Sequence, residues 1–200
     1  MSAPQTILRP DLAVIARHVP QGARVLDIGC GDGSLMEVLQ AQRGVDARGL
    51  EIDPEEVELC VSKGLSVIQG DADRDLADYP DGAFDVAILS QTLQTAQRPD
   101  WMLEQLLRVG RQAFVSFPNF AYWRMRLSLL ANGRMPVTRH LPISWYATKN
   151  IHHLTVADFE ALLAERGVKT EGSWFFAAGQ EIGSAGANWR AEHAVFQLSR

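Results

Sequence analysis

An apolar stretch that runs into evenly spaced glycines constrains the fold of this chain more than any other feature. Residues 24–28 (RVLDI) are too apolar for either face of a strand to meet water, and Gly29, Gly31 and Gly33 follow at alternate positions. Apolar residues at helical spacing begin after Ser34. A buried strand, a glycine turn and a helix N-terminus in succession predict a βα unit whose backbone N–H groups are open to a ligand.

The same alternation continues along the chain. Further strands are expected at residues 47–52, 66–69, 84–90 and 112–117, and helices at 11–18 and from Pro54, Pro99 and Thr155. Strands at 174–176 and 193–198 are expected to form a final antiparallel pair across a turn at 177–187. This order predicts an α/β, Rossmann-like fold with a mostly parallel sheet and helices on both faces. We expect one domain over residues 1–200, with a ligand-binding core at 22–117.

Composition excludes several other classes of protein. The chain has 200 residues, of which 46% are hydrophobic and 22% charged, as in ordinary globular domains. No apolar run approaches the roughly 18 residues that a membrane span needs. Two cysteines are too few for a disulfide scaffold and indicate a reducing compartment. Residues 1–10 are polar and are expected to be a ragged leader. The sequence therefore predicts a cytosolic protein that is not associated with a membrane.

Residues 119–150 interrupt the alternation and are too long for a simple connection. They lie within a stretch, 105–157, that has no Asp or Glu but seven Lys or Arg residues and many aromatic residues. Such a segment is typical of a cap that covers a ligand site, or of a surface that binds an anionic ligand or an acidic protein. The alternative is a solvated arginine face beside packed aromatics. The formal net charge of −5 argues against a general nucleic-acid binder.

Acidic residues stand at or near the carboxyl ends of the first three predicted strands. Asp27 precedes the glycine turn, Glu51 follows Gly31 by 20 residues, and Asp71 closes the third strand. A carboxylate in the position of Glu51 can accept hydrogen bonds from ribose hydroxyls, and one in the position of Asp71 can accept one from an adenine amino group. Asp53 is interpreted instead as a helix N-cap.

Together these residues resemble the class I S-adenosylmethionine-dependent methyltransferases. The resemblance implies a seven-stranded sheet whose last strand is antiparallel, and it implies S-adenosylmethionine (SAM) or S-adenosylhomocysteine (SAH) as cofactor. The residues that it assigns to the cofactor are Asp27, Gly29, Cys30, Gly31, Gly33, Glu51, Ile52, Asp71, Ala72 and Ser90. A NAD-linked dehydrogenase is disfavoured, because Ser34 stands where its fingerprint has a third glycine and Asp27 would meet the pyrophosphate.

Four further motifs resemble the MetW family of methionine biosynthesis proteins. They are LSQTLQ at 89–94, SFPNF at 116–120, GRMPVT at 133–138 and WYATKNIH at 145–152. What the resemblance implies is a role in methionine biosynthesis beside MetX, a homoserine O-acyltransferase. No methyl acceptor follows from it.

The sequence does not reveal a general base for methyl transfer. The end of the fourth strand reads SQTL at 90–93, which lacks the motif of enzymes that methylate the amino groups of bases. The candidates are Tyr146 and His152, whereas Arg124, Arg126 and Trp145 are candidates for contacting a substrate or partner. No metal site is expected.

Two hypotheses for the function remain: a SAM-binding accessory protein of the acyltransferase, or a methyltransferase that acts on a small anionic metabolite. RNA methylation is a third, supported only by the basic stretch.

Overall fold

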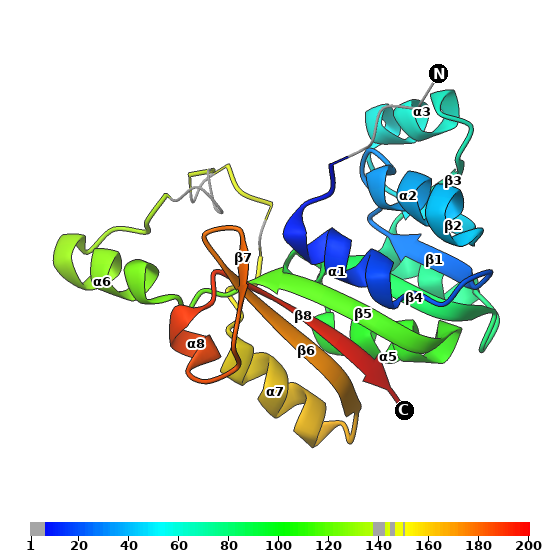
Figure 1. The fold of residues 1–200 in the computed structure, drawn as a ribbon. Helices are drawn as coiled ribbons and strands as arrows, with labels where there is room; N and C mark the ends of the chain where they lie inside the picture. The colour runs from blue at the N-terminus through cyan, green and yellow to red at the C-terminus, as the bar shows by residue number, and fades with distance from the viewer. Residues whose placement is uncertain (1–6, 138–142, 145–146, 150) are drawn as a thin grey trace.

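A computed structural model describes residues 7–137, 143–144, 147–149 and 151–200. The described residues form an eight-stranded sheet in the order β3-β2-β1-β4-β5-β8-β6-β7 (Figure 1). The strands are β1 (Arg24–Ile28), β2 (Asp46–Glu51), β3 (Ser66–Gln69), β4 (Phe84–Ser90), β5 (Gly110–Pro118), β6 (Lys169–Ala177), β7 (Gln180–Ile182) and β8 (His193–Ser199). The first five are mutually parallel, whereas β8 is antiparallel to both β5 and β6.

Helices cover both faces of the sheet, as the sequence predicts. They are α1 (Pro10–His18), α2 (Ser34–Arg43), α3 (Pro54–Ser62), α4 (Ala72–Asp75), α5 (Pro99–Val109), α6 (Trp123–Asn132), α7 (Val156–Glu165) and α8 (Ala187–Arg190), with short 3-10 turns η1 (Leu76–Asp78) and η2 (Leu93–Thr95). One buried cluster joins α1, α2 and Cys60 of α3 to the sheet, and the other joins α5 and α7 to the opposite face.

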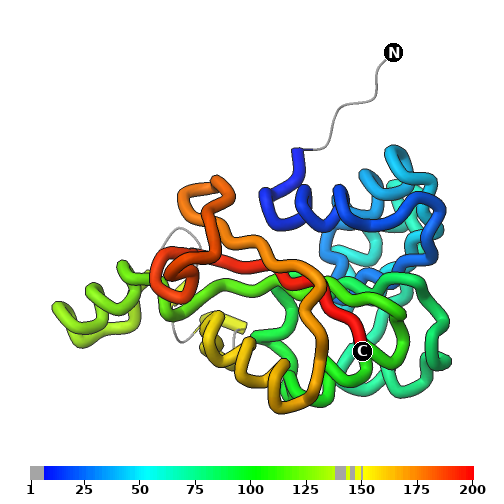
Figure 2. Tube along the Cα trace, turned by 60° about the horizontal axis from the view of Figure 1, so that its bottom comes forward, coloured from blue at the N-terminus to red at the C-terminus, as the bar shows by residue number. Residues whose placement is uncertain are grey.

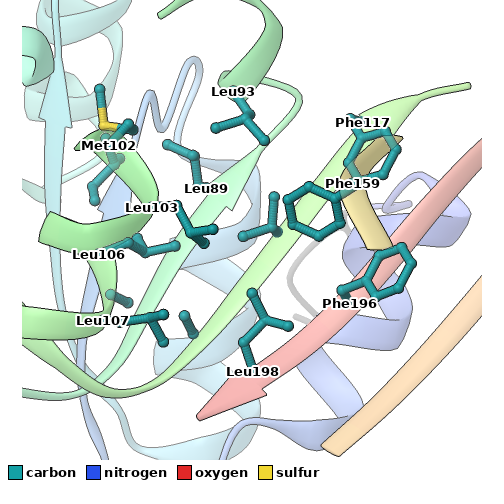
Figure 3. Close-up of a cluster of buried hydrophobic side chains, with 14 of the residues drawn as sticks. Leu89, Leu93, Met102, Leu103, Leu106, Leu107, Phe117, Phe159, Phe196 and Leu198 are labelled. Atoms are coloured by element: carbon teal, nitrogen blue, oxygen red, sulfur yellow. The ribbon is translucent and has the colours of Figure 1, made fainter. Parts of the chain in front are cut away.

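Aromatic and leucine side chains fill the core on the α5–α7 face (Figure 3). The ring of Phe117 lies 4.8 Å from that of Phe159 and 5.9 Å from that of Phe196, measured between centroids. Because the three rings come from β5, α7 and β8, they join the parallel and antiparallel parts of the sheet. Each fully buried aromatic or leucine side chain contributes about 1.5–3 kcal/mol of hydrophobic stabilisation.

Local sequence explains where several helices begin. Pro10, Pro54 and Pro99 occupy the first helical turn, where a missing N–H costs no hydrogen bond. The side chain of Asp53 accepts a hydrogen bond from the Glu55 N–H at 3.1 Å, which confirms Asp53 as an N-cap. At α7, which begins where the sequence predicts, a capping box is present with Thr155 as the N-cap residue.

The C-terminal part of the sheet differs from the prediction in two ways. The sheet has eight strands instead of seven, because Gln180–Ile182 pairs with the end of β6 inside the expected turn. Strand β6 starts at Lys169, five residues before its predicted start. The prediction missed the first half of the strand because that half is mostly exposed and shows no apolar run. The pairing of this half with β8 is also irregular, with a register shift between Thr170 and Gly172.

The described part of the 119–150 insert contains one helix, α6. Figures 1 and 2 show α6 projecting from the body at the end of the molecule opposite to α3. Asn119 fixes the beginning of the insert: its Nδ2 donates to the carbonyls of Ala191 and Asn188, and its Oδ1 accepts from the N–H groups of Ala121 and Val156. None of the described residues forms a helix long and apolar enough to cross a membrane.

Candidate functional site

Two adjoining cavities open at the carboxyl ends of the parallel strands. The larger, about 630 Å³, is bordered by the glycine turn and Asp27 and is called here the glycine-loop cavity. The second, about 330 Å³, is bordered by Glu51, Ile52, Asp71 and Ala72 and is called the Glu51 cavity. Both are lined by Gly29 and Thr92, so they adjoin around the end of β1. Ligands of open α/β sheets bind at this edge.

The glycine turn has a backbone that other residues adopt only with strain. Gly29, Gly31 and Gly33 have φ of 70°, 52° and 74°. Gly31 lines the glycine-loop cavity and no atom lies within 4 Å of where its Cβ would be, so its bare backbone faces open space. Gly33 serves packing instead, since a Cβ there would lie 2.3 Å from Leu65 Cδ1. Gly33 is not among the described lining residues of either cavity.

Asp27 supplies a buried carboxyl group to the glycine-loop cavity. Its residue is only 2% exposed. Burial, and to a smaller degree the nearby Glu51 carboxylate, raise the pKa of Asp27 from 3.8 to about 7, while Arg9 opposes the shift. A cation in the cavity would favour the ionised form of Asp27. The site is therefore suited to the ammonium or sulfonium of a ligand.

Glu51 is held by three backbone N–H groups. Its Oε2 accepts a hydrogen bond from Gly31 at 2.9 Å, and its Oε1 accepts from Ile52 at 2.8 Å and Asp53 at 3.0 Å. A carboxylate offers about four acceptor positions, so Oε2 keeps one for a ligand hydroxyl. A second hydroxyl would share a position already used by the backbone. These bonds fix the carboxylate beside the glycine turn.

The remaining predicted cofactor residues are distributed over both cavities. Asp71 and Ala72 line the Glu51 cavity, and Asp71 also caps α4 by accepting a hydrogen bond from the Asp73 N–H. Ser90 and Cys30 line the glycine-loop cavity. Burial raises the pKa of the Cys30 thiol, so this cysteine is a poor nucleophile. Cys60 is buried as well, and its thiol contacts the carbonyl of Gly31 at 3.1 Å.

The segment before α1 contributes residues that the sequence did not single out. Ile7, Leu8 and Arg9 line the glycine-loop cavity, although residues 1–10 were expected to be a ragged leader. Arg9 forms an ion pair with Asp11, whose side chain is buried beneath the ends of β4 and β5. In the sequence, Asp11 is an Asp in the first turn of a helix and looks like an ordinary N-terminal acid. Its burial is visible only in the structure.

Those candidates for catalysis and partner contact that the structure describes lie apart from this centre. Trp145 and Tyr146 fall outside the described residues. The N–H of His152 donates to the Gln94 carbonyl at 3.0 Å, and His152 is not among the described lining residues of either cavity. Arg124 and Arg126 lie on the projecting α6, each over a tryptophan ring, Trp123 and Trp189 respectively. The described insert residue that reaches the Glu51 cavity is Lys149.

Sequence comparison identifies the family. A family model described as methionine biosynthesis protein MetW matches residues 9–198. The chain belongs to the MetW family. The match includes Arg9 and α1, so of the cavity-lining residues missed in the sequence analysis it covers Arg9.

Individual relatives agree with this assignment. A bifunctional methionine biosynthesis protein MetXA/MetW of Rhodopirellula baltica is 32% identical over 205 residues, covering 96% of this chain but 33% of that protein. The chain thus spans about a third of the length of this MetW relative. A ubiquinone biosynthesis O-methyltransferase of Xanthomonas axonopodis is 31% identical over 79% of this chain and 67% of its own length.

Solved structures confirm the predicted fold class. An S-adenosylmethionine-dependent methyltransferase of Mesorhizobium loti superposes with a TM-score of 0.70 at 18% identity, covering 96% of this MetW chain and 98% of its own. Identity at this level shows the fold alone. The Rossmann-like methyltransferase fold predicted from the glycine turn and the strand-end acids is therefore correct, with one strand more than expected.

Proposed function

We propose that this chain binds SAM or SAH across the two cavities. The observation that carries the proposal is the placement of Asp27 and Glu51 around one glycine turn, with cavities on both sides of Gly29. Asp27 would meet the amino-acid part of the cofactor, Glu51 the ribose, and Asp71 with Ala72 the adenine. When bound, SAM supplies an activated methyl group. The backbone of Gly31 leaves room for the ligand's close approach.

We further propose that the chain acts in methionine biosynthesis as an accessory subunit of a MetX-like homoserine O-acyltransferase. Support comes from membership of the MetW family and from a relative named as a bifunctional MetXA/MetW protein. A relative that carries both names in one chain is consistent with two functions that work side by side.

Helix α6 is the surface we assign to that association. Leu127, Leu129 and Leu130 are 46%, 47% and 83% exposed, and α6 projects away from the sheet (Figure 2). Arg124 and Arg126 add positive charge, and α6 has no acidic residue. Apolar and arginine side chains together favour a protein partner with an acidic rim around an apolar centre.

A methyltransferase that acts on a small anionic metabolite is the second candidate. The observation in its favour is the 31% identity to a ubiquinone biosynthesis O-methyltransferase over most of this chain. Against it, the glycine-loop and Glu51 cavities hold no described histidine that could serve as a base. The two candidates differ in what they predict: turnover of SAM to SAH, or binding without turnover.

Calorimetric titration with SAH tests the cofactor site. Glu51→Ala removes the ribose acceptor and should weaken binding by about 1.5–3 kcal/mol, or roughly 10- to 150-fold. Gly31→Val should abolish binding, because a side chain at φ 52° is strained and occupies the open space. Glu58→Ala on the exposed side of α3 is the matched control and should leave affinity unchanged. Absence of SAH binding by the unaltered protein would refute the cofactor proposal.

Acyl transfer to homoserine tests the partnership. The acyltransferase of the same organism is assayed alone, with this chain, and with a Leu127→Glu and Leu130→Glu double variant of α6. We expect a rate increase with the unaltered chain, and loss of both the increase and the association with the variant. SAH affinity of the variant should be unchanged, because no described α6 residue lines either cavity and α6 projects away from the body of the molecule (Figure 1). An unchanged rate, with no association between the two proteins, would favour free-standing methyl transfer.

A further inference from the structure

The insert places one cationic side chain at the Glu51 cavity, and the cofactor assignment above makes no use of it. Lys149 lines that cavity together with Glu51, Asp71 and Asp73, and it is the one Lys or Arg among the described lining residues. A lysine ammonium carries three N–H donors, whereas ionised carboxylates only accept hydrogen bonds. Lys149 therefore adds a kind of hydrogen-bonding group that the acidic residues of the cavity lack.

Adenosine needs both kinds of group. Its amino group and ribose hydroxyls donate hydrogen bonds to carboxylates, but its ring nitrogens accept them and need donors. The two hydroxyl side chains that line the cavity already donate within the protein: Thr95 Oγ1 to the Thr92 carbonyl at 2.7 Å, and Thr92 Oγ1 to the Ser90 carbonyl at 3.1 Å. Among the described lining side chains, Lys149 is thus the donor that a bound adenosine can use.

The ion pair that Lys149 forms leaves it available to a ligand. Its Nζ lies 4.0 Å from Asp53 Oδ2, and its side chain is 84% exposed. Such an exposed pair contributes little to stability, because water screens the two charges. An acceptor atom of a ligand in the cavity can therefore replace Asp53 at little cost.

Two backbone hydrogen bonds attach the end of the insert to the wall of the Glu51 cavity. The N–H groups of Ile151 and His152 donate to the Gln94 carbonyl at 2.9 Å and 3.0 Å. Gln94 belongs to η2, and Thr92 and Thr95 beside it line the cavity. The lysine lies two residues before the first of these bonds, so they keep it at the cavity.

Gln94 is itself fixed by burial and by a hydrogen bond within its own turn. It is only 4% exposed, and its Nε2 donates to the Gln91 carbonyl at 2.6 Å. Gln91 has a φ of 52°, which a residue other than glycine keeps only where surrounding contacts impose it. The side chain of Gln94 is one of these contacts. It thus stabilises the turn whose carbonyl holds the end of the insert.

We propose that Lys149 is a cofactor-binding residue supplied by the insert, and that Gln94 positions it. The inference rests on the proposed cofactor site. When SAM or SAH occupies the Glu51 cavity, the Lys149 ammonium exchanges Asp53 for an acceptor atom of the adenosine part. Glu51 and Asp71 accept hydrogen bonds from the donors of the same part.

Gln94 acts through the backbone of the insert. It is not among the described lining residues of the glycine-loop or Glu51 cavity, and its carbonyl holds Ile151 and His152 instead. Occupancy of the Glu51 cavity therefore stabilises the end of the insert. This connects the cofactor to the segment that carries α6, the surface assigned to the partner.

The first test measures affinity for two ligands by calorimetry. One is SAH, and the other is 5′-methylthioadenosine, which has the adenosine part without the amino-acid part. Lys149→Met should weaken the binding of both by about five- to tenfold, through loss of one hydrogen bond from an exposed charged group. Lys169→Met is the matched control. Lys169 is also an exposed lysine paired with an acid, Glu171 at 2.9 Å, but it lines neither cavity, so both affinities should stay unchanged.

The outcomes separate this inference from the cofactor proposal. Unchanged affinities in Lys149→Met would overturn the inference and leave the cofactor site intact. A loss for SAH without a loss for methylthioadenosine would also overturn it, because Lys149 would then act on the amino-acid part. If the unaltered protein binds neither ligand, the cofactor proposal fails and the inference fails with it. If it binds SAH but not methylthioadenosine, the exchange experiment described below decides.

The second test addresses Gln94 with a double-variant cycle. Gln94→Met removes the hydrogen bond to the Gln91 carbonyl. If Gln94 positions Lys149, the loss of SAH affinity caused by Lys149→Met should shrink to under about twofold in the Gln94→Met background. Additive losses would contradict the positioning role, because a change in stability alone leaves the effect of Lys149 intact.

Amide hydrogen exchange follows the end of the insert directly and does not require the Gln94 variant to fold. Saturating SAH should slow exchange of the Ile151 and His152 amides by at least about fivefold in the unaltered protein, and should not slow it in Lys149→Met. The Val168 amide, which donates to the Leu163 carbonyl at 2.9 Å, is the control and should exchange at one rate throughout. Equal exchange of the Ile151 and His152 amides with and without SAH would overturn the proposal.

Discussion

Replacing Asp27 by Asn should change how the stability of the ligand-free protein depends on pH. In the folded state burial, with a contribution from Glu51, raises the pKa of Asp27 to about 7, whereas the unfolded chain has the ordinary value of 3.8. Between these two values the folded protein keeps a proton that the unfolded chain releases. Unfolding is therefore favoured as the pH rises, and the penalty levels off above pH 7.

The magnitude follows from the two pKa values. Linkage gives a loss of about 2.5 kcal/mol in the free energy of unfolding between pH 5 and pH 8, and nearly all of it falls below pH 7.5. Asparagine has nearly the same shape but does not titrate, so the variant escapes this loss. Other titrating groups are common to both proteins and cancel in the difference.

Urea denaturation at pH 5, 6, 7 and 8 measures the effect. The difference in unfolding free energy, variant minus unaltered protein, should grow by about 2.5 kcal/mol in favour of Asn from pH 5 to pH 8. Equal m-values in the two proteins would establish that the same transition is compared. Two curves that run parallel across this range would refute the reasoning, because Asp27 would then titrate alike in the folded and unfolded chains.

Three further outcomes are expected. SAH affinity should rise about eightfold from pH 6 to pH 7.5, as Asp27 ionises, and calorimetry should find no such rise in Asp27→Asn. Asn119→Ala should cost about 3–5 kcal/mol of unfolding free energy, because three buried backbone groups and one partly buried carbonyl lose their partner, whereas the exposed Asn132→Ala should cost under about 0.5 kcal/mol. Phe196→Ala, which leaves a cavity between Phe117 and Phe159, should cost about 3–5 kcal/mol in the same denaturation assay.

The part of the site that could be predicted is local in the sequence. The glycine turn, Asp27 and Ser34 lie within ten residues, and each has a conformational or chemical requirement that its residue type meets. Glu51 could be predicted because parallel strands end at one edge of the sheet, so a fixed spacing along the chain becomes proximity in space. In the structure its carboxylate lies 2.9 Å from the Gly31 N–H.

The part that could not be predicted depends on contacts between distant residues. Asp11 is bonded to Ser90 and Ser116, which are 79 and 105 residues away, and its own neighbourhood is an ordinary helix start. The positive φ of Ala178 also has no sequence signal, because alanine does not favour that conformation. Only the closing of β6 against β7 and β8 places it beside α1.

The position of Arg9 bears on how an accessory protein could respond to SAM. A ligand changes a protein's state only through a difference in its interactions with the two states. Arg9 lines the glycine-loop cavity, forms an ion pair with Asp11 and precedes α1, which packs on the sheet. A cofactor carboxylate that draws Arg9 away from Asp11 would alter the start of α1. A partner that distinguishes these two states of α1 would change SAM affinity by the same factor by which SAM changes the affinity for that partner.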